Sequence, residues 1–182
     1  MRHHIPNAIT GLRGLMGPAL AFYLTSGGNH FIAFWLFILA IASDLLDGFA
    51  ARRLGVTHNP MGKWLDPFCD KVLTDFVWVA LWMIGFAPGW IAWPIVIRDL
   101  IVIIAWCICR VKGLAWERPS AVGQVAVAFE GVAVSVFLFH GPWLDVHWPS
   151  VGTVLGVITL VLTVIALVPY LRWGPTPLEP LG

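Results

Sequence analysis

Charged residues are scarce in this sequence. They make up 12% of its 182 residues, against 59% hydrophobic residues, and the mean hydropathy is +0.83. Soluble domains carry about 25% charged residues, so this composition excludes an ordinary soluble domain and indicates a polytopic membrane protein. The formal net charge is only +1. We expect the lipid bilayer, and not nucleic acid, as a partner of this chain.

Cysteine is also scarce, because the chain contains only Cys69, Cys107 and Cys109. An odd number of cysteines excludes a secreted disulfide framework, and Cys107-x-Cys109 does not have the spacing of a zinc site. We therefore interpret all three as reduced thiols of apolar surroundings. A cleavable signal peptide is not expected, since no convincing small-residue cleavage site followed by a soluble domain occurs near the N-terminus.

Apolar runs of about twenty residues recur along the chain, and a helix of this length crosses the hydrocarbon core of a bilayer. Turn-forming stretches such as "TSGGN", "GFAPG" and "KGLAWERPS" separate them. The pattern predicts an all-α integral membrane fold, with residues 1–182 as a single transmembrane domain and no separate soluble domain. The six predicted transmembrane helices cover residues 8–26, 30–53, 62–86, 89–111, 120–140 and 150–172.

Lysine and arginine are missing from the three loops around Gly27, Pro88 and Pro142. The basic residues gather instead at the other ends of the predicted helices. Cytoplasmic loops of membrane proteins carry the excess of Lys and Arg. The asymmetry predicts that the N-terminus, the C-terminus and the 54–61 loop lie on the cytoplasmic side.

Acidic residues are concentrated in one short window, which contains Asp44, Asp47, Asp66 and Asp70. Asp44 and Asp47 are spaced i, i+3 near the end of the second predicted helix. Asp66 and Asp70 are spaced i, i+4 near the start of the third. Each spacing places both members of a pair on one helix face. A short loop makes the two helices antiparallel neighbours, so we expect the two pairs to converge near the cytoplasmic membrane surface.

Four converging carboxylates cannot all stay ionised unless protons or cations neutralise them. Carboxylate oxygens suit Mg²⁺ or Mn²⁺, and two such ions can clamp phosphate oxygens. Gly48 leaves room for a ligand at the backbone, and Arg52 offers a bidentate phosphate donor. These features indicate a phosphate or pyrophosphate substrate. The alternative is simple salt bridging of the acids, and four groups of one charge on facing helix ends are poorly arranged for it. The basic residues available for such bridges are Arg52, Arg53, Lys63 and Lys71.

The order and spacing of these residues resemble the signature of the CDP-alcohol phosphotransferases, which are integral-membrane enzymes of phospholipid synthesis. Nine residues separate Arg52 from Gly62, one more than the commoner spacing of that family. The resemblance implies six transmembrane helices around a polar cavity open to the cytoplasm, a homodimer, and a location in the bacterial inner membrane. The eight matching positions are Asp44, Asp47, Gly48, Ala51, Arg52, Gly62, Asp66 and Asp70.

The resemblance also implies a role for each matching residue. Two divalent ions, Mg²⁺ or Mn²⁺, are expected to grip the pyrophosphate of CDP-diacylglycerol, and Asp70 is expected to act also as the general base that deprotonates the acceptor alcohol. The segment "IPNAITGLR" is similar to the amino-terminal segment of bacterial members. The metal ligands implied are Asp44, Asp47, Asp66 and Asp70, and the CDP-lipid contacts implied are Asn7, Thr10, Gly48, Arg52 and Asn59.

The acceptor alcohol stays open. Glycerol 3-phosphate is the first candidate, as in phosphatidylglycerophosphate synthases. However, Gln124, Ala126 and Val127 stand where those enzymes carry lysine, lysine and threonine. That difference leaves room for phosphatidylglycerol, as in cardiolipin synthases, or for inositol phosphate or serine. The basic residues that we expect to recruit an anionic acceptor are Arg98, Arg110, Lys112 and Arg118.

Four further charged positions allow more than one interpretation. Arg98 and Asp99 in the fourth predicted helix either neutralise each other or leave Arg98 facing the cavity. Glu130 in the fifth pairs with Arg98 or contacts a substrate hydroxyl, and Asp75, off the Asp66/Asp70 face, is equally explained by a salt bridge. Two other classes of function are alternatives to an enzyme, namely a cation transporter and a catalytically silent scaffold. The clustering of the acids at one end of the helices, beside Gly48 and Arg52, favours an enzyme over a transporter.

Overall fold

The computed structural model describes residues 4–54, 62–112, 114–115, 121–139, 147–173 and 176–177. Nearly all of these residues are helical, which confirms the expected all-α class. Across the described ranges there are six helices, and each coincides with one predicted apolar segment. They are α1 (His4–Thr25), α2 (His30–Leu54), α3 (Gly62–Met83), α4 (Gly89–Val111), α5 (Ala121–Leu138) and α6 (Trp148–Trp173).

Two helix boundaries differ from the prediction by three residues or more, for local reasons. The third helix was expected to reach residue 86, but α3 ends at Met83 and Gly85 follows with a φ of +77°. This left-handed conformation is the usual way to end a helix, and glycine adopts it without steric cost. The first helix begins at His4 rather than near residue 8. Pro6 is compatible with that earlier start, because the first N–H groups of a helix have no intrahelical partner.

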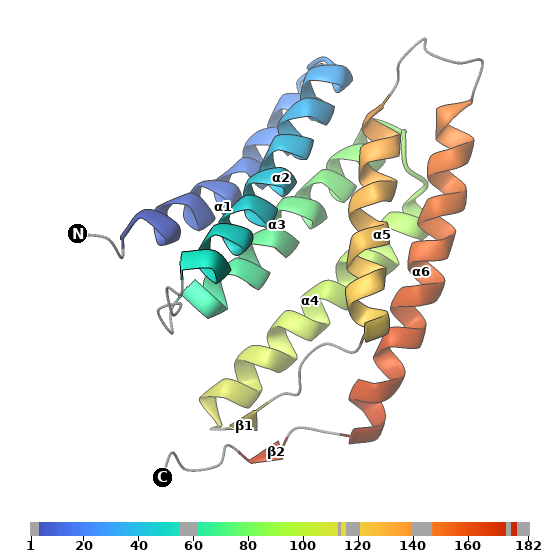
Figure 1. Ribbon diagram of the computed structural model, residues 1–182. Coiled ribbons are helices and arrows are strands. Elements are labelled where there is room, and N and C mark those ends of the chain that lie inside the picture. Colours follow the sequence, from blue (N-terminus) through green and yellow to red (C-terminus); the bar gives the residue numbers. More distant parts are fainter. Residues whose placement is uncertain are drawn as a thin grey trace.

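The six helices run up and down in sequence order (Figure 1). Helix α1 packs most extensively against α3, and α5 packs most extensively against α6. Helix α3 also contacts α4 and α5, so it lies between the two halves of the bundle. The structure adds one feature that the prediction did not include. Strands β1 (Leu114–Ala115) and β2 (Thr176–Pro177) pair antiparallel next to the ends of α4 and α6 (Figure 1).

The core is built from large side chains of several helices. Trp78 of α3, Phe37 of α2 and Phe137 of α5 are completely buried, and the rings of Trp78 and Phe137 meet edge to face at 5.7 Å. Helix α6 approaches this core through glycine. A Cβ at Gly152 would lie 2.8 Å from the Phe137 ring, and one at Gly156 would lie 2.9 Å from Ile91. The spacing Gly152-x-x-x-Gly156 is the small-residue pattern by which membrane helices pack closely.

The surface of the helices is strongly apolar, and the interior contains charge. Exposed faces of α4 and α6 carry isoleucine, leucine and valine, whereas Arg13, Asp75, Asp99 and Glu130 are buried. A soluble protein has the opposite distribution, since ionisable groups are rarely buried without a functional or pairing reason. The arrangement fits a protein whose outer surface contacts lipid.

Two stretches of the described chain are long and apolar enough to cross a membrane. They are Gly89–Cys109 in α4 and Trp148–Val168 in α6, with mean hydropathies of 2.1 and 2.7. Only 33% and 28% of these windows are buried inside the structure, so they are not core helices of the kind found in soluble proteins. Two shorter apolar stretches, His30–Ser43 and Val122–Leu138, accompany them.

Candidate functional site

The signature residues lie at the ends of α2 and α3 that the sequence predicted. Asp44 and Asp47 belong to the C-terminal part of α2, and Asp66 and Asp70 belong to the N-terminal part of α3. The helical spacing on which the two carboxylate pairs depend is therefore present in the backbone. Among the four acids, Asp70 is the one whose side chain falls within the described part of the chain.

Several of the other predicted site residues lie wholly or partly outside the described structure. Asn59 and Arg118 lie outside the described residues. The backbones of several others are helical, but their side chains lie outside the described part of the structure. These are Asn7 and Thr10 in α1, Asp44, Asp47 and Arg52 in α2, Asp66 in α3, and Arg110 in α4.

Asp70 forms an ion pair with Arg13 of α1. The Nη1 of Arg13 donates a hydrogen bond to Oδ1 of Asp70 at 2.8 Å. The two partners differ in exposure, because the Arg13 side chain is 3% exposed and the Asp70 side chain is 42% exposed. Asp70 therefore presents a carboxylate at the accessible edge of the α1–α3 contact while its partner is held inside. This position suits a group that reacts with a substrate.

The backbone around Asp70 is firmly packed. Thr74 donates its hydroxyl hydrogen to the Asp70 carbonyl oxygen at 3.0 Å. On the facing helix, a Cβ at Gly14 would lie 2.9 Å from the sulfur of Cys69, and a Cβ at Gly17 would lie 2.8 Å from the Cα of Leu73. Both contacts are closer than real Cβ atoms tolerate, so these glycines are what allow α1 to approach α3 at the level of Asp70.

The residue after Asp70 belongs to a second, buried ion network. The Nζ of Lys71 lies 2.6 Å from Oδ2 of Asp99, and Oδ1 of Asp99 accepts a hydrogen bond from Nη1 of Arg98. Asp99 is 0% exposed and Arg98 is nearly buried. Of the two interpretations open for Arg98, the structure shows the pairing with Asp99, and the role in acceptor binding stays a prediction. Lys112, another predicted acceptor contact, lies exposed directly after α4.

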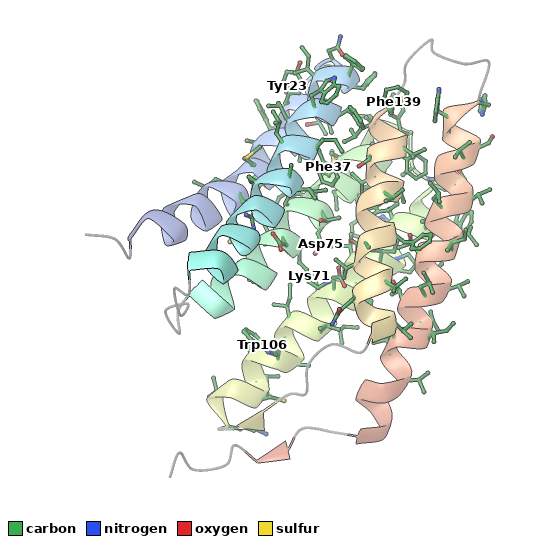
Figure 2. The ribbon with its side chains drawn as sticks, viewed as in Figure 1. Tyr23, Phe37, Lys71, Asp75, Trp106 and Phe139 are labelled. Atoms are coloured by element: carbon green, nitrogen blue, oxygen red, sulfur yellow. The ribbon has the colours of Figure 1, made fainter. Side chains whose placement is uncertain are left out.

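Asp75 and Glu130 extend this network toward α5. Ligand oxygens of Asp75, Asp99 and Glu130 all lie within 4.8 Å of one another, and all three residues are buried. Figure 2 shows Lys71 and Asp75 on the same side of α3, directed into the bundle. We call these five residues the central charge cluster: Lys71, Asp75, Arg98, Asp99 and Glu130.

The central charge cluster could in principle hold a metal ion, because carboxylate oxygens are suitable ligands. Its chemistry fits an ion-pair network better. Both oxygens of Asp99 already face cations, Arg98 and Lys71, so a metal ion would have to displace one of them. The cluster has three acids and two cations, so its excess is one negative charge. A divalent ion carries two positive charges, and one excess negative charge does not neutralise it. We therefore assign the cluster to packing of α3, α4 and α5.

Sequence reasoning missed one of these partners. Salt bridging of the aspartates was the less favoured alternative, with Arg52, Arg53, Lys63 and Lys71 as the available cations, and the structure pairs Asp70 with Arg13. One signal was present, because Arg13 is a charged residue within the apolar run of α1, and such residues mark pairing or function. Glu130 was expected to pair with Arg98 or to contact a substrate hydroxyl, and the structure places it in the cluster that also contains Arg98, beside Asp75 and Asp99.

Comparison with known proteins supports the resemblance seen in the signature. The family model described as CDP-alcohol phosphatidyltransferase matches residues 3–165. The chain is 32% identical over 178 residues to CDP-diacylglycerol–glycerol-3-phosphate 3-phosphatidyltransferase of Pseudomonas fluorescens, covering 93% of this chain and 89% of that protein. It is 30% identical over 129 residues to the enzyme of the same name from Bacillus subtilis, covering 70% of this chain and 66% of that protein.

A second kind of relative has a different name. The chain is 34% identical over 117 residues to human cardiolipin synthase (CMP-forming), an alignment that covers 64% of this chain. The alignment spans only 38% of the length of the human protein. Relatives of both kinds thus match this chain. The resemblance predicted from Asp44 to Asp70 is confirmed, and the family model extends it over most of the sequence. The chain belongs to the CDP-alcohol phosphatidyltransferase family.

Proposed function

We propose that this protein is a membrane-embedded enzyme that transfers a phosphatidyl group from CDP-diacylglycerol to an alcohol and releases CMP. One observation carries the proposal. Asp70, the last acid of the family signature, is a half-exposed carboxylate on a tightly packed α1–α3 contact. A general base needs both features, since it must reach the substrate and must be held in place while it does so.

The reaction is an in-line displacement at phosphorus. The acceptor hydroxyl oxygen attacks the phosphorus that carries the diacylglycerol, and its proton passes to the Asp70 carboxylate. A new oxygen–phosphorus bond forms as the pyrophosphate bond breaks, and CMP leaves with the bridging oxygen. Positioning and neutralisation of phosphate charge supply most of the catalysis in such reactions.

Enzymes of this family use a divalent metal ion. We propose that Mg²⁺ or Mn²⁺ is held by Asp44, Asp47, Asp66 and Asp70 and that, when bound, it neutralises charge on the pyrophosphate. The helical spacing of both acid pairs supports this assignment. The proposed donor contacts are the residues that the family resemblance implied, namely Asn7, Thr10, Gly48, Arg52 and Asn59.

The acceptor is glycerol 3-phosphate or phosphatidylglycerol, since relatives named for each reaction match this chain. Both acceptors are anionic, and Lys112 is an exposed cation directly after α4. We propose that Lys112 acts with Arg110 and Arg118 in attracting the acceptor. Arg98 is a weaker candidate, because its guanidinium is buried against Asp99.

We further propose that all six helices span the bilayer, with both termini in the cytoplasm, and that the protein is a homodimer in a bacterial inner membrane. Two observations support the topology. The loops around Gly27 and Pro88 lack Lys and Arg, and the helices alternate in direction (Figure 1). A fluorescent protein fused to the C-terminus should fluoresce if that end is cytoplasmic, and a dark fusion that is inserted in the membrane would contradict the orientation.

The central test is CMP release by the purified protein in mixed micelles of detergent and CDP-diacylglycerol. Glycerol 3-phosphate, phosphatidylglycerol, inositol phosphate and serine are supplied one at a time, with Mg²⁺ or with Mn²⁺. We expect release with glycerol 3-phosphate or phosphatidylglycerol and no release after addition of a chelator. The Asp70→Asn variant, purified in parallel, controls for contaminating enzymes. Absence of release with every acceptor would contradict the proposal and favour the transporter or scaffold alternatives.

A further inference from the structure

Arg13 is the most deeply buried of the described lysine and arginine residues. It lies in the apolar first helix, its side chain is 3% exposed, and its Nη1 contacts Oδ1 of Asp70 at 2.8 Å. A buried guanidinium is costly unless it has a purpose or a partner. Its partner is the one carboxylate that the proposed function treats as reactive.

The position of Arg13 relative to Asp70 is set by the backbones of two helices. Gly14 follows Arg13 directly and faces Cys69, the residue before Asp70. One turn further along α1, Gly17 faces the backbone of Leu73. Because α1 and α3 are in backbone contact on this face, Arg13 cannot move away from Asp70 without separating the helices. The packing of α1 on α3 therefore fixes the position of Arg13 relative to Asp70.

A half-exposed aspartate has considerable freedom to rotate. Proton transfer requires the carboxylate oxygen to lie within hydrogen-bond reach of the acceptor hydroxyl, about 2.6–3.2 Å between heavy atoms. A charge-assisted hydrogen bond to one carboxylate oxygen restricts that rotation. Residues that orient a reactive group in this way act through it and need not touch the substrate.

We propose that Arg13 is a positioning residue for Asp70. It holds the carboxylate through Oδ1, so that α1 sets the direction in which Asp70 meets the acceptor hydroxyl. This role rests on the proposed function, in which Asp70 takes the proton. Stabilisation of the fold is not its main effect, since solvent screens an ion pair whose carboxylate is 42% exposed.

The test compares Arg13→Met, which keeps the length of the side chain and removes its charge, with Arg13→Lys, which keeps the charge. Thr74→Val is the matched control, because it removes a hydrogen bond to the Asp70 carbonyl oxygen and leaves the carboxylate untouched. For each protein we would measure kcat, the KM for CDP-diacylglycerol, Mn²⁺ binding by electron paramagnetic resonance, and the unfolding midpoint in detergent.

We expect Arg13→Met to lower kcat by about 100-fold, the size of effect that a misplacement of about 1 Å produces. The KM for CDP-diacylglycerol should stay at its wild-type value, and the unfolding midpoint should fall by less than about 4 °C. The Mn²⁺ dissociation constant should change, because Asp70 is also a proposed metal ligand, and the role of Arg13 requires that kcat stays reduced at saturating Mn²⁺. Arg13→Lys should recover part of kcat, because an ammonium also donates to a carboxylate but lacks the planar fork of arginine. Thr74→Val should keep the wild-type kcat.

Several outcomes would overturn this role. A wild-type kcat in Arg13→Met would show that Asp70 needs no orientation from α1. Tighter Mn²⁺ binding in Arg13→Met with unchanged kcat would show that Arg13 only competes with cations for Asp70. If Arg13→Met fails to fold, Arg13→Lys decides, because the role requires a reduced kcat with an unchanged midpoint. A wild-type protein that releases no CMP would instead contradict the proposed function, and this role would fall with it.

Discussion

Asp70 and Lys71 are consecutive residues of α3, and each belongs to a different charged site. Asp70 pairs with Arg13 of α1 and stays 42% exposed. Lys71 pairs with Asp99 of α4, which is 0% exposed. Successive residues of a helix point about 100° apart, so one turn of α3 can serve two neighbouring helices. The two pairs have similar chemistry but differ in their access to solvent.

This difference separates a reactive group from a structural one. A charge that must exchange a proton with a substrate has to be reachable, and only the Arg13–Asp70 pair meets that condition. The central charge cluster lies between α3, α4 and α5 and connects these three helices. Pairs of this kind are strongly destabilising when one partner is removed, because the other charge stays buried. We therefore expect the two sites to respond differently to mutation.

The largest effect is expected from Asp70→Asn. Loss of the general base should lower CMP release by about 10²–10⁴-fold. The free energy of unfolding should fall by less than in a variant of the fully buried Asp99. Arg13 stays buried, but the half-exposed Asp70 position is screened by solvent and the amide oxygen of asparagine can still accept its hydrogen bond. Turnover is measured by CMP release, and nucleotide binding by calorimetry with CDP, which the variant should retain. Turnover close to that of the wild type would remove Asp70 from the mechanism.

Asp99→Asn should have the largest effect on stability. It leaves the buried Arg98 and the partly buried Lys71 without their shared anion, and breaking a buried pair costs about 3–5 kcal/mol. The free energy of unfolding is measured by denaturant titration in detergent micelles. If Asp99→Asn lowered the free energy of unfolding by less than Asp70→Asn does, the central charge cluster would not be the structural site described above.

Gly17→Ala should have an intermediate effect, on stability and on turnover. The new Cβ would meet the backbone of Leu73 at 2.8 Å, and overpacking of this kind costs about 1–3 kcal/mol. It should also lower turnover, since α1 carries Arg13. Gly11→Ala is the matched control, because nothing lies within 4 Å of a Cβ there and alanine favours a helix by about 1 kcal/mol. Equal unfolding midpoints for the two variants would argue against close α1–α3 packing.

Glu130→Gln should have the smallest effect. The change removes the excess negative charge of the central charge cluster and leaves both ion pairs of Asp99 intact. Oε1 of Glu130 has no hydrogen-bond partner among the described residues. The free energy of unfolding should therefore change by less than about 1 kcal/mol or increase. A loss as large as that of Asp99→Asn would show that Glu130 is a required member of the network.

Much of the fold could be predicted from local sequence. The apolar runs and the turn residues between them located all six helices, and the spacing of Asp66 and Asp70 placed both on α3. The end of α3 was missed by three residues, because the apolar run continues past Gly85 and hydropathy does not register a change of backbone conformation. The short β1–β2 pair was missed because two-residue strands carry almost no sequence pattern.

The pairing of charges was much less predictable. The salt-bridge alternative for Asp70 considered only nearby basic residues, and the structure pairs Asp70 with Arg13, 57 positions away. Arg98 and Asp99 are adjacent, and their pairing was one of two interpretations that the sequence left open. The third member of that group, Lys71, comes from another helix. A contact that depends on helix packing has no signature in the spacing of residues along one helix.

Composition and the spacing of apolar residues alone determined the membrane class of this chain and the positions of its helices. These properties depend on apolar length and on the helical period, which are local quantities. Only the tertiary structure decided which carboxylate stays accessible and which is closed inside the bundle. The physical reason is that exposure and pairing follow from how closely helices approach, and here the glycines of α1 bring Arg13 to Asp70.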